Sequence, residues 1–218
     1  TLGNSASAVA GSDKPFTFSF WVKIDASGAG VDYLFAQGTN QYRAYYSHTS
    51  GEINMLIMNN GSANPKLSLR SNVVSSTVEG KWAHVAITYA AGTPGGDNAW
   101  VQSVSRIYVN GKDETSGNTA MSGGTYVSMK PDHSRELFIG ASYNGGAEHT
   151  GHMAEFAIYS KALTQSEISA IYNTYKDRRY GFESGFTTQN PRVIILENDN
   201  EEDESLHSNA HNELLRSS

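Results

Sequence analysis

The stretch Phe16–Ile24, with the sequence FTFSFWVKI, decides the fold class. Apolar side chains stand at every second position, and Thr17, Ser19, Trp21 and Lys23 stand between them. Because successive side chains of a β-strand point to opposite faces, this alternation predicts a strand with one buried face.

Shorter alternating stretches follow along the chain and are separated by clusters of Gly, Asn, Asp and Ser. This arrangement is typical of antiparallel strands joined by turns. We predict strands at Tyr33–Gln37, Tyr42–His48, Ile53–Asn59, Lys66–Arg70, Trp82–Tyr89, Arg106–Val109, Leu137–Ile139 and Met153–Tyr159. Asn110-Gly111 predicts a two-residue hairpin turn, since both central positions of such a turn need positive φ.

One helix is predicted after Leu163. Thr164 and Glu167 have the spacing of a capping box, and Leu163 and Ile168 that of the hydrophobic staple that accompanies it. The regular pattern ends near Tyr180. We therefore divide the chain into an all-β sandwich over residues 1–180 and an extended acidic C-terminal tail over residues 181–218.

Composition agrees with one large all-β domain. The chain has 218 residues, of which 38% are hydrophobic and 17% charged, with 21 Gly and 12 Tyr. It has no cysteine, which excludes disulfides and thiolate metal sites and fits a bacterial or viral source. No apolar run is long enough to cross a bilayer, so no membrane insertion is expected. The first residue is Thr1, which we interpret as a sign of processing or of a longer polypeptide.

The net charge of −6 arises in the tail. Residues 1–196 hold fifteen acidic and fifteen basic residues, whereas residues 197–218 hold seven acidic and one basic. The body therefore lacks the clustered Lys and Arg that bind a phosphate backbone, which argues against nucleic acid as a partner.

Five segments together resemble the laminin-G-like and pentraxin-like family of the concanavalin A-like superfamily. They are Phe16–Lys23, Trp82–Tyr89, Ile107–Gly111, Ile139–Ala141 and Gly151–Ile168, and they follow the family's order and spacing. The resemblance implies a concanavalin A-like jelly-roll sandwich of two antiparallel sheets with one short C-terminal helix. It also implies a glycan or protein ligand, in some members bound through calcium at a loop edge. In the stretch Gly151–Glu155, Ala154 stands where the family commonly has Asp, which argues against a calcium site that needs this carboxylate.

Carboxylates that would make the chain a glycoside hydrolase are not apparent. Such enzymes use two carboxylates across the scissile bond, and on a strand these commonly lie two or four residues apart. Glu52 and Asn54 share a strand face, but no partner carboxylate accompanies them. We therefore do not expect the chain to be an enzyme.

The histidines allow two interpretations. Histidines beside carboxylates, as in Glu148-His149, leave a transition-metal role open, whereas His84 within its strand is interpreted as a buried sheet histidine.

Two loops hold candidate ligand residues. Asn and acidic side chains are typical calcium ligands, which predicts a calcium edge formed by Asp97, Asn98, Asn144 and Glu148. The alternative is that these residues only form turns. Trp100 and Tyr143 can stack on sugar rings, which predicts a ligand site of Trp100, Tyr143, Asn144 and Glu148. Tyr45 and Tyr46 lie on opposite strand faces, so at least one should be buried.

The tail contains the apolar run Val193, Ile194, Ile195 and Leu196, followed by the acidic stretch Glu197–Glu204. We expect residues 191–218 to pack on a neighbouring subunit or another protein by strand addition. The alternative is that they lie along their own domain.

The family resemblance and the lack of a catalytic carboxylate pair favour a non-catalytic glycan-binding or adhesion module on a cell surface or virion. The alternative is a structural subunit of a coat, fibre or decoration layer, with a homo-oligomer formed through the tail.

Overall fold

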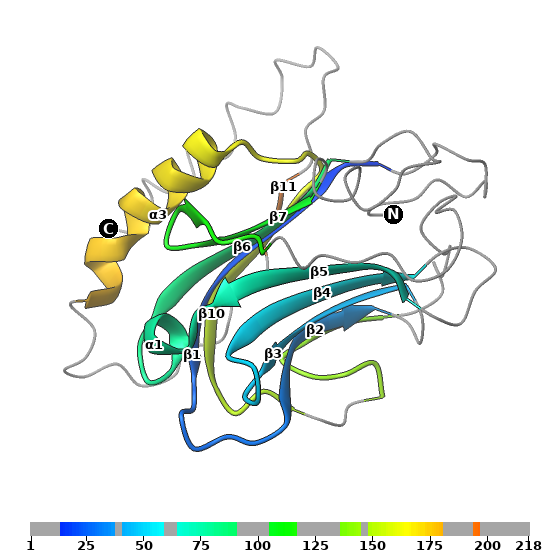
Figure 1. The fold of residues 1–218 in the computed structure, drawn as a ribbon. Helices are drawn as coiled ribbons and strands as arrows, with labels where there is room; N and C mark the ends of the chain where they lie inside the picture. The colour runs from blue at the N-terminus through cyan, green and yellow to red at the C-terminus, as the bar shows by residue number, and fades with distance from the viewer. Residues whose placement is uncertain are drawn as a thin grey trace, which may run out of the picture.

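The alternating segment forms strand β1 (Phe16–Ile24), which lies inside the larger of two packed sheets in a computed structural model of the protein (Figure 1). The structure describes residues 14–37, 41–58, 65–90, 105–116, 136–144, 148–180 and 194–196. The elements follow the strand prediction closely, with bounds that differ by one or two residues at several ends.

The first sheet has six strands in the order β11-β10-β1-β6-β7-β8. Its other members are β6 (Ala83–Tyr89), β7 (Ser105–Val109), β8 (Lys112–Asp113), β10 (Gly151–Tyr159) and β11 (Ile194–Leu196). Neighbouring strands are antiparallel except for β10 and β11, which are parallel. The predicted antiparallel sheets are thus confirmed, and the parallel pairing of β11 is an addition at one edge.

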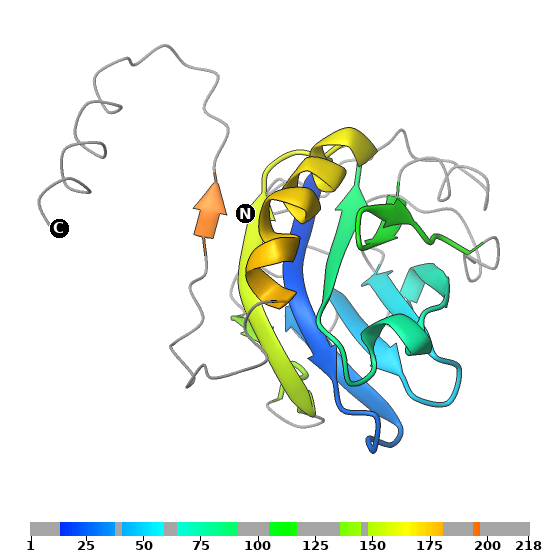
Figure 2. The ribbon, with the colours of Figure 1, turned by 90° about the vertical axis from the view of Figure 1, so that its left-hand side faces the viewer.

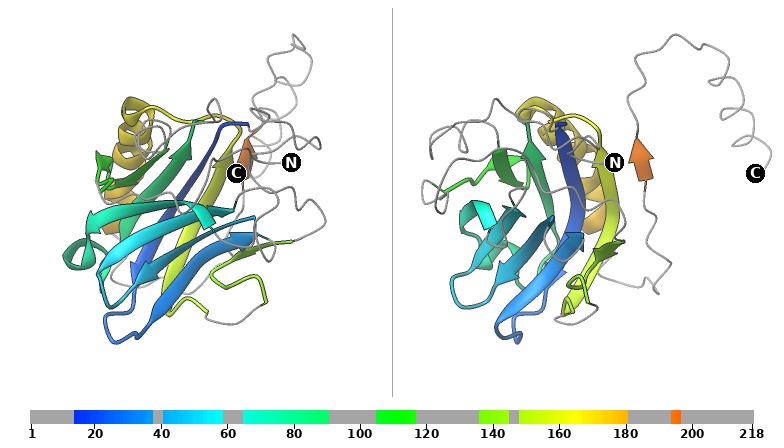
Figure 3. Two further views of the ribbon diagram at one scale, coloured as in Figure 1. Left: turned by 45° about the vertical axis from the view of Figure 1, so that its right-hand side comes forward. Right: turned by 90° about the vertical axis from the view of Figure 1, so that its right-hand side faces the viewer.

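The second sheet has five antiparallel strands in the order β5-β4-β3-β2-β9. Its members are β2 (Val31–Gln37), β3 (Tyr42–Ser47), β4 (Glu52–Met58), β5 (Pro65–Val73) and β9 (Leu137–Ile139). The two sheets face each other as layers of a sandwich, which Figure 3 shows from two further sides. This architecture confirms the jelly-roll prediction.

The core between the sheets is rich in aromatic rings from β1. Phe16, Phe18 and Phe20 are fully buried, and the Phe18 ring lies 4.2 Å from that of Phe35 on the opposite sheet, measured between centroids. Phe156 of β10 stacks on Phe20 at 5.3 Å. Aromatic pairs at such distances contribute packing energy beyond their buried area. The inward face predicted from the alternation is therefore the one that joins the sheets.

A β-bulge interrupts β10 where it pairs with β1. The register shifts between Ser19 and Trp21, and Glu155, the residue left over on β10, has a φ of +52°. One extra residue changes which side chains point inward. Met153, Phe156 and Ile158 consequently all pack on the core.

The Asn110-Gly111 turn is confirmed. Both residues have positive φ, +51° and +78°, and they join β7 to β8. A Cβ on Gly111 would lie 3.3 Å from the Cα of Ser169, so this glycine also permits the close approach of a helix.

Helix α3 (Gln165–Tyr180) lies on the outer face of the six-stranded sheet (Figure 2). The Thr164 backbone N–H donates to Glu167 Oε2 at 2.8 Å, and the Glu167 N–H donates to Thr164 Oγ1 at 3.3 Å, which confirms the capping box. Leu163 and Ile168 pack in one buried cluster, as the staple predicted. A one-turn helix, α1 (Ser75–Val78), was not predicted. None of the described helices is long and apolar enough to span a membrane.

The tail differs from its prediction where it is described. Ile194, Ile195 and Leu196 pair in parallel with Ala157, Ile158 and Tyr159 of the same chain, rather than with a neighbouring subunit. Strand addition was the right mode, and the strand that the tail pairs with is β10 of its own chain. Val193 and residues 197–218 lie outside the described residues.

Candidate functional site

The outer face of the five-stranded sheet carries a regular grid of polar and aromatic side chains. Cross-strand register places them in three rows, which are Val31–Ser47–Glu52–Val73, Tyr33–Tyr45–Asn54–Arg70 and Phe138–Ala36–Arg43–Leu56–Ser68. Residues at alternate positions of each strand point into the core instead, so these rows share the opposite face. We call this set the tyrosine–arginine face.

Two tyrosines form the centre of this face. The rings of Tyr33 on β2 and Tyr45 on β3 lie 5.8 Å apart between centroids and are tilted by 45°. Both residues are partly buried, whereas Tyr46, the next residue on β3, is fully buried in the core. The expectation that one of Tyr45 and Tyr46 is buried is therefore confirmed. A pair of partly open rings on one sheet face is suited to stacking on a flat ligand.

Positive charge surrounds Tyr45. Burial raises the pKa of its phenol, and the charges of Arg43 and Arg70 act in the opposite direction. Asn54, the cross-strand partner of Tyr45, lies next to Arg70 on β5 and adds an amide to the row. This face thus combines aromatic rings with guanidinium and amide groups.

Glu52 is the carboxylate of the three rows. Its cross-strand partners are Ser47 on β3 and Val73 on β5, and neither is acidic. A pair of opposed carboxylates, as glycoside hydrolysis requires, is therefore not formed in these rows.

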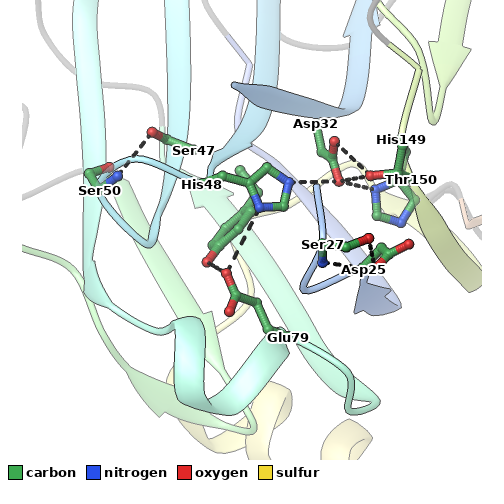
Figure 4. A network of polar contacts seen from close by, with 10 residues as sticks. Asp25, Ser27, Asp32, Ser47, His48, Ser50, Glu79, His149 and Thr150 are labelled. Carbon is green, nitrogen blue, oxygen red and sulfur yellow. Dashed lines mark hydrogen bonds and ion pairs between the residues drawn. The ribbon is translucent and has the colours of Figure 1, made fainter. Parts of the chain in front are cut away.

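A second polar cluster closes one end of the sandwich (Figure 4). At its centre is Asp32, 2% exposed, whose carboxylate accepts a hydrogen bond from Thr150 Oγ1 at 2.9 Å. His48 Nε2 lies 3.3 Å and His149 Nδ1 3.5 Å from Asp32 Oδ2, one on each side. Burial lowers the pKa of His149, and the Asp32 charge acts against this shift. The cluster joins the start of β2, the turn after β3 and the residues before β10.

Further contacts hold this end cluster in place. Tyr46 donates from its hydroxyl to Glu79 Oε1 at 2.6 Å, and His48 Nδ1 lies 3.9 Å from the same oxygen. Burial and the hydrogen bond to Glu79 raise the pKa of Tyr46. A Cβ on Gly28 would lie 2.4 Å from His48 Nε2, so only glycine allows the β1–β2 loop to cross here.

The end cluster is interpreted as a structural element. Two imidazoles and a carboxylate are ligand types for a transition metal. Within the described parts of the chain, however, no group of three or more His, Asp or Glu residues has the arrangement to hold a metal ion. The buried carboxylate, its threonine donor and the two flanking rings instead join strand β2 to the turn after β3 and to the residues before β10.

The structure describes three of the residues that were predicted for the calcium edge and the ligand site, namely Tyr143, Asn144 and Glu148. Tyr143 is 37% exposed, and Asn144 and Glu148 are exposed as well, so the structure leaves all three open to solvent. Ser142 donates from its hydroxyl to Asn144 Oδ1. Glu148 directly precedes His149 of the end cluster. Asp97, Asn98 and Trp100 lie outside the described residues, so the predicted calcium edge stays a prediction.

His84 occupies a buried polar site beneath α3. Its Nε2 lies 2.8 Å from Ser19 Oγ, and its ring lies 5.5 Å from Trp21 and 6.3 Å from Tyr172 of the helix. Burial lowers its pKa to about 4, which keeps the imidazole neutral at pH 7. The interpretation of His84 as a buried sheet histidine is confirmed.

Sequence reasoning found part of the tyrosine–arginine face. It placed Glu52 and Asn54 on one face and named Tyr45, but it did not connect them with Tyr33, Arg43 or Arg70. Those residues lie on three other strands, and the bulge between Tyr33 and Phe35 shifts the register that would have to be known. The alternation of side chains within each strand was the sequence signal that could have shown which residues share this face.

Comparison with known proteins identifies the family of this chain. A laminin G-type family model, described as the concanavalin A-like lectin/glucanases superfamily, matches residues 3–169. The chain belongs to this superfamily. The resemblance found in the five sequence segments is thereby confirmed.

Solved structures related to the superfamily fold are distant in sequence. A native heptameric SAP-like pentraxin from Limulus polyphemus is 18% identical, with 73% of this chain and 70% of that chain covered and a TM-score of 0.47. The botulinum neurotoxin serotype D binding domain is 16% identical, with 74% and 37% covered and a TM-score of 0.46. A serotype D ligand binding domain in complex with N-acetylneuraminic acid is 16% identical, with 78% and 39% covered and a TM-score of 0.45. This chain thus spans well under half of the two toxin chains.

Proposed function

We propose that this chain is a non-catalytic glycan-binding module whose ligand lies on the tyrosine–arginine face. The observation that carries the proposal is the Tyr33–Tyr45 pair, two rings 5.8 Å apart on a sheet face that also holds Arg43, Asn54 and Arg70. Sugar rings have apolar faces that pack on aromatic side chains, and their hydroxyls need donors and acceptors nearby. Membership of a superfamily of lectins and glucanases supports a carbohydrate ligand.

Binding, rather than hydrolysis, fits the polar groups of this face. Glu52 faces Ser47 and Val73, so an acid and a nucleophile do not oppose each other in the described rows. A module of this kind would act outside a cell, on a cell surface or on a virion.

A glycan array, followed by calorimetry on the best ligand, tests the proposal. Tyr45→Ala should weaken binding about tenfold or more, because stacking on one ring contributes on the order of 1–3 kcal/mol. Tyr175→Ala, on the helix over the opposite sheet, is the matched control. Tyr143→Ala tests the rival site at the loop edge, and a chelator tests whether calcium at Asn144 and Glu148 takes part. If no glycan binds with or without calcium, or if only Tyr143→Ala abolishes binding, the proposal is wrong.

A structural role in an assembly is the second candidate, and the β10–β11 pairing favours it. Three residues of the tail add to the outer edge of β10 within one chain. The same three-residue pairing can form between two chains if the tail exchanges, which would build an oligomer without any new contact type. Mass measurement of the full chain beside a version ending at Tyr180 tests this role. A defined oligomer that is lost on truncation supports it, and a monomer in both forms argues against it.

A further inference from the structure

The arginines of the tyrosine–arginine face have no acidic partner among the described residues. Arg43 lies between Ala36 and Leu56 across the strands, and Arg70 is exposed at the end of the neighbouring row. Glu52, the carboxylate of the rows, forms no ion pair with either of them. By contrast Arg106, on the other sheet, lies 3.3 Å from Asp113. The charges of Arg43, Arg70 and Glu52 all act on Tyr45, and two positive charges against one negative leave a net positive charge around this ring.

One guanidinium nitrogen is also left without a hydrogen-bond acceptor. The Nε of Arg43 is buried and has no hydrogen-bond partner in the structure. Because this nitrogen is closed to solvent, a ligand can approach the guanidinium only through its two terminal nitrogens. These two nitrogens also form a planar fork that can bind a carboxylate through two parallel hydrogen bonds.

From this arrangement we propose that the ligand of the tyrosine–arginine face is an acidic glycan that carries carboxylate groups, such as a chain of uronic acids. This inference rests on the proposed function, because it assigns a ligand class to the same face. A sugar ring stacks on Tyr45 or Tyr33, and its carboxylate binds the Arg43 fork. Arg70, exposed at the edge, attracts the next acidic residue of the glycan by charge.

Ala36 and Leu56, the cross-strand neighbours of Arg43, are buried and apolar, so they offer the ligand no competing charge. A sulfate presents two oxygens to an arginine fork as a carboxylate does, and only a binding experiment separates the two groups. Sulfated glycans are therefore an arm of the test.

Four probes and four variants test the inference by calorimetry at low salt. The probes are a galacturonate oligomer, its methyl ester with the same rings and no charge, a neutral galactose oligomer and a sulfated galactan. Arg43→Gln should weaken galacturonate binding about tenfold or more, and Arg43→Lys should not restore it because an ammonium group lacks the planar fork. Arg70→Gln should weaken binding less and should remove part of its salt dependence. Arg106→Gln is the control for loss of one arginine.

The outcomes separate this inference from the proposed function. Tight binding of the galacturonate oligomer with weak binding of its methyl ester supports it. Equal binding of the acid, the ester and the neutral oligomer overturns the acidic class but leaves glycan binding intact, and preference for the sulfated galactan overturns the carboxylate. Absence of binding to every glycan overturns both. Because Arg70 is exposed, Arg70→Gln gives a folded test protein even if the Arg43 variants unfold.

Discussion

Protonation of His84 should weaken the sandwich at mildly acidic pH. The imidazole is 1% exposed, and it is held between Ser19 of β1, Trp21 and Tyr172 of α3. In the unfolded chain the pKa returns to the ordinary value of 6.5, whereas burial lowers it to about 4 in the folded protein. Between these values the unfolded chain takes up the proton more readily, so stability is full above pH 6.5 and is lost as the pH falls toward 4.

The size of this effect follows from the two pKa values. For a shift from 6.5 to about 4, the free energy of unfolding falls by about 2.5 kcal/mol between roughly pH 7.5 and roughly pH 4.5. His84→Gln keeps a polar side chain beside Ser19 but cannot titrate. Its stability should therefore lose about 2.5 kcal/mol less than that of the unchanged protein over the same interval.

Urea unfolding followed by circular dichroism at several pH values measures this difference. His152→Gln, at an exposed position of β10, serves as the control and should keep the pH dependence of the unchanged protein. The lowered pKa of His149 acts in the same direction in the unchanged protein and in the His84 variant, so it cancels in that comparison. Equal pH slopes for the His84 variant and the unchanged protein, or a His84 pKa near 6.5 by NMR titration, would refute the reasoning.

Three further perturbations have expected outcomes. Phe18→Ala should lower the free energy of unfolding by about 3–5 kcal/mol in a denaturant titration, because removal of the ring leaves a cavity in the core. A loss below about 1 kcal/mol would contradict this packing. Thr164→Ala should cost about 1 kcal/mol by removing the cap of α3, with Thr174→Ala as the matched control inside the same helix. Deletion of residues 191–218 should leave the melting temperature of the monomer nearly unchanged and weaken any assembly seen by mass measurement, and a large loss of monomer stability would contradict it.

Local sequence rules predicted the elements that depend on neighbouring residues. The alternation of Phe16–Ile24, the Asn110-Gly111 turn and the Thr164–Glu167 cap are each complete within a few residues, so the chemistry that forms them is visible in the sequence. The resemblance to a known family then supplied the arrangement of the strands in two packed sheets. The fold could therefore be predicted almost completely.

The candidate site could not be predicted in the same way, because it depends on register between distant strands. Tyr33 and Arg70 share a row only through the pairing of β2, β3, β4 and β5, which includes two bulged pairs. Asp32, His48 and His149 meet across a separation of more than one hundred residues, and no short motif marks them. The self-pairing of Ile194–Leu196 was only the alternative in the sequence analysis, because an apolar run shows that a strand can be added but not to which edge.

Because of the bulge at Glu155, the inward-facing positions of β10 follow one alternation before this residue and another after it. Before it, Met153 is the inward residue, and after it Phe156 and Ile158 are, so the first two inward residues lie three positions apart instead of two. Deleting Glu155 would place Met153, Phe156 and Ile158 at alternate positions of an unbulged strand, so all three would still face the core. The deletion therefore removes the bulge and its left-handed residue together, whereas replacing Glu155 by glycine keeps the bulge and relieves the left-handed backbone.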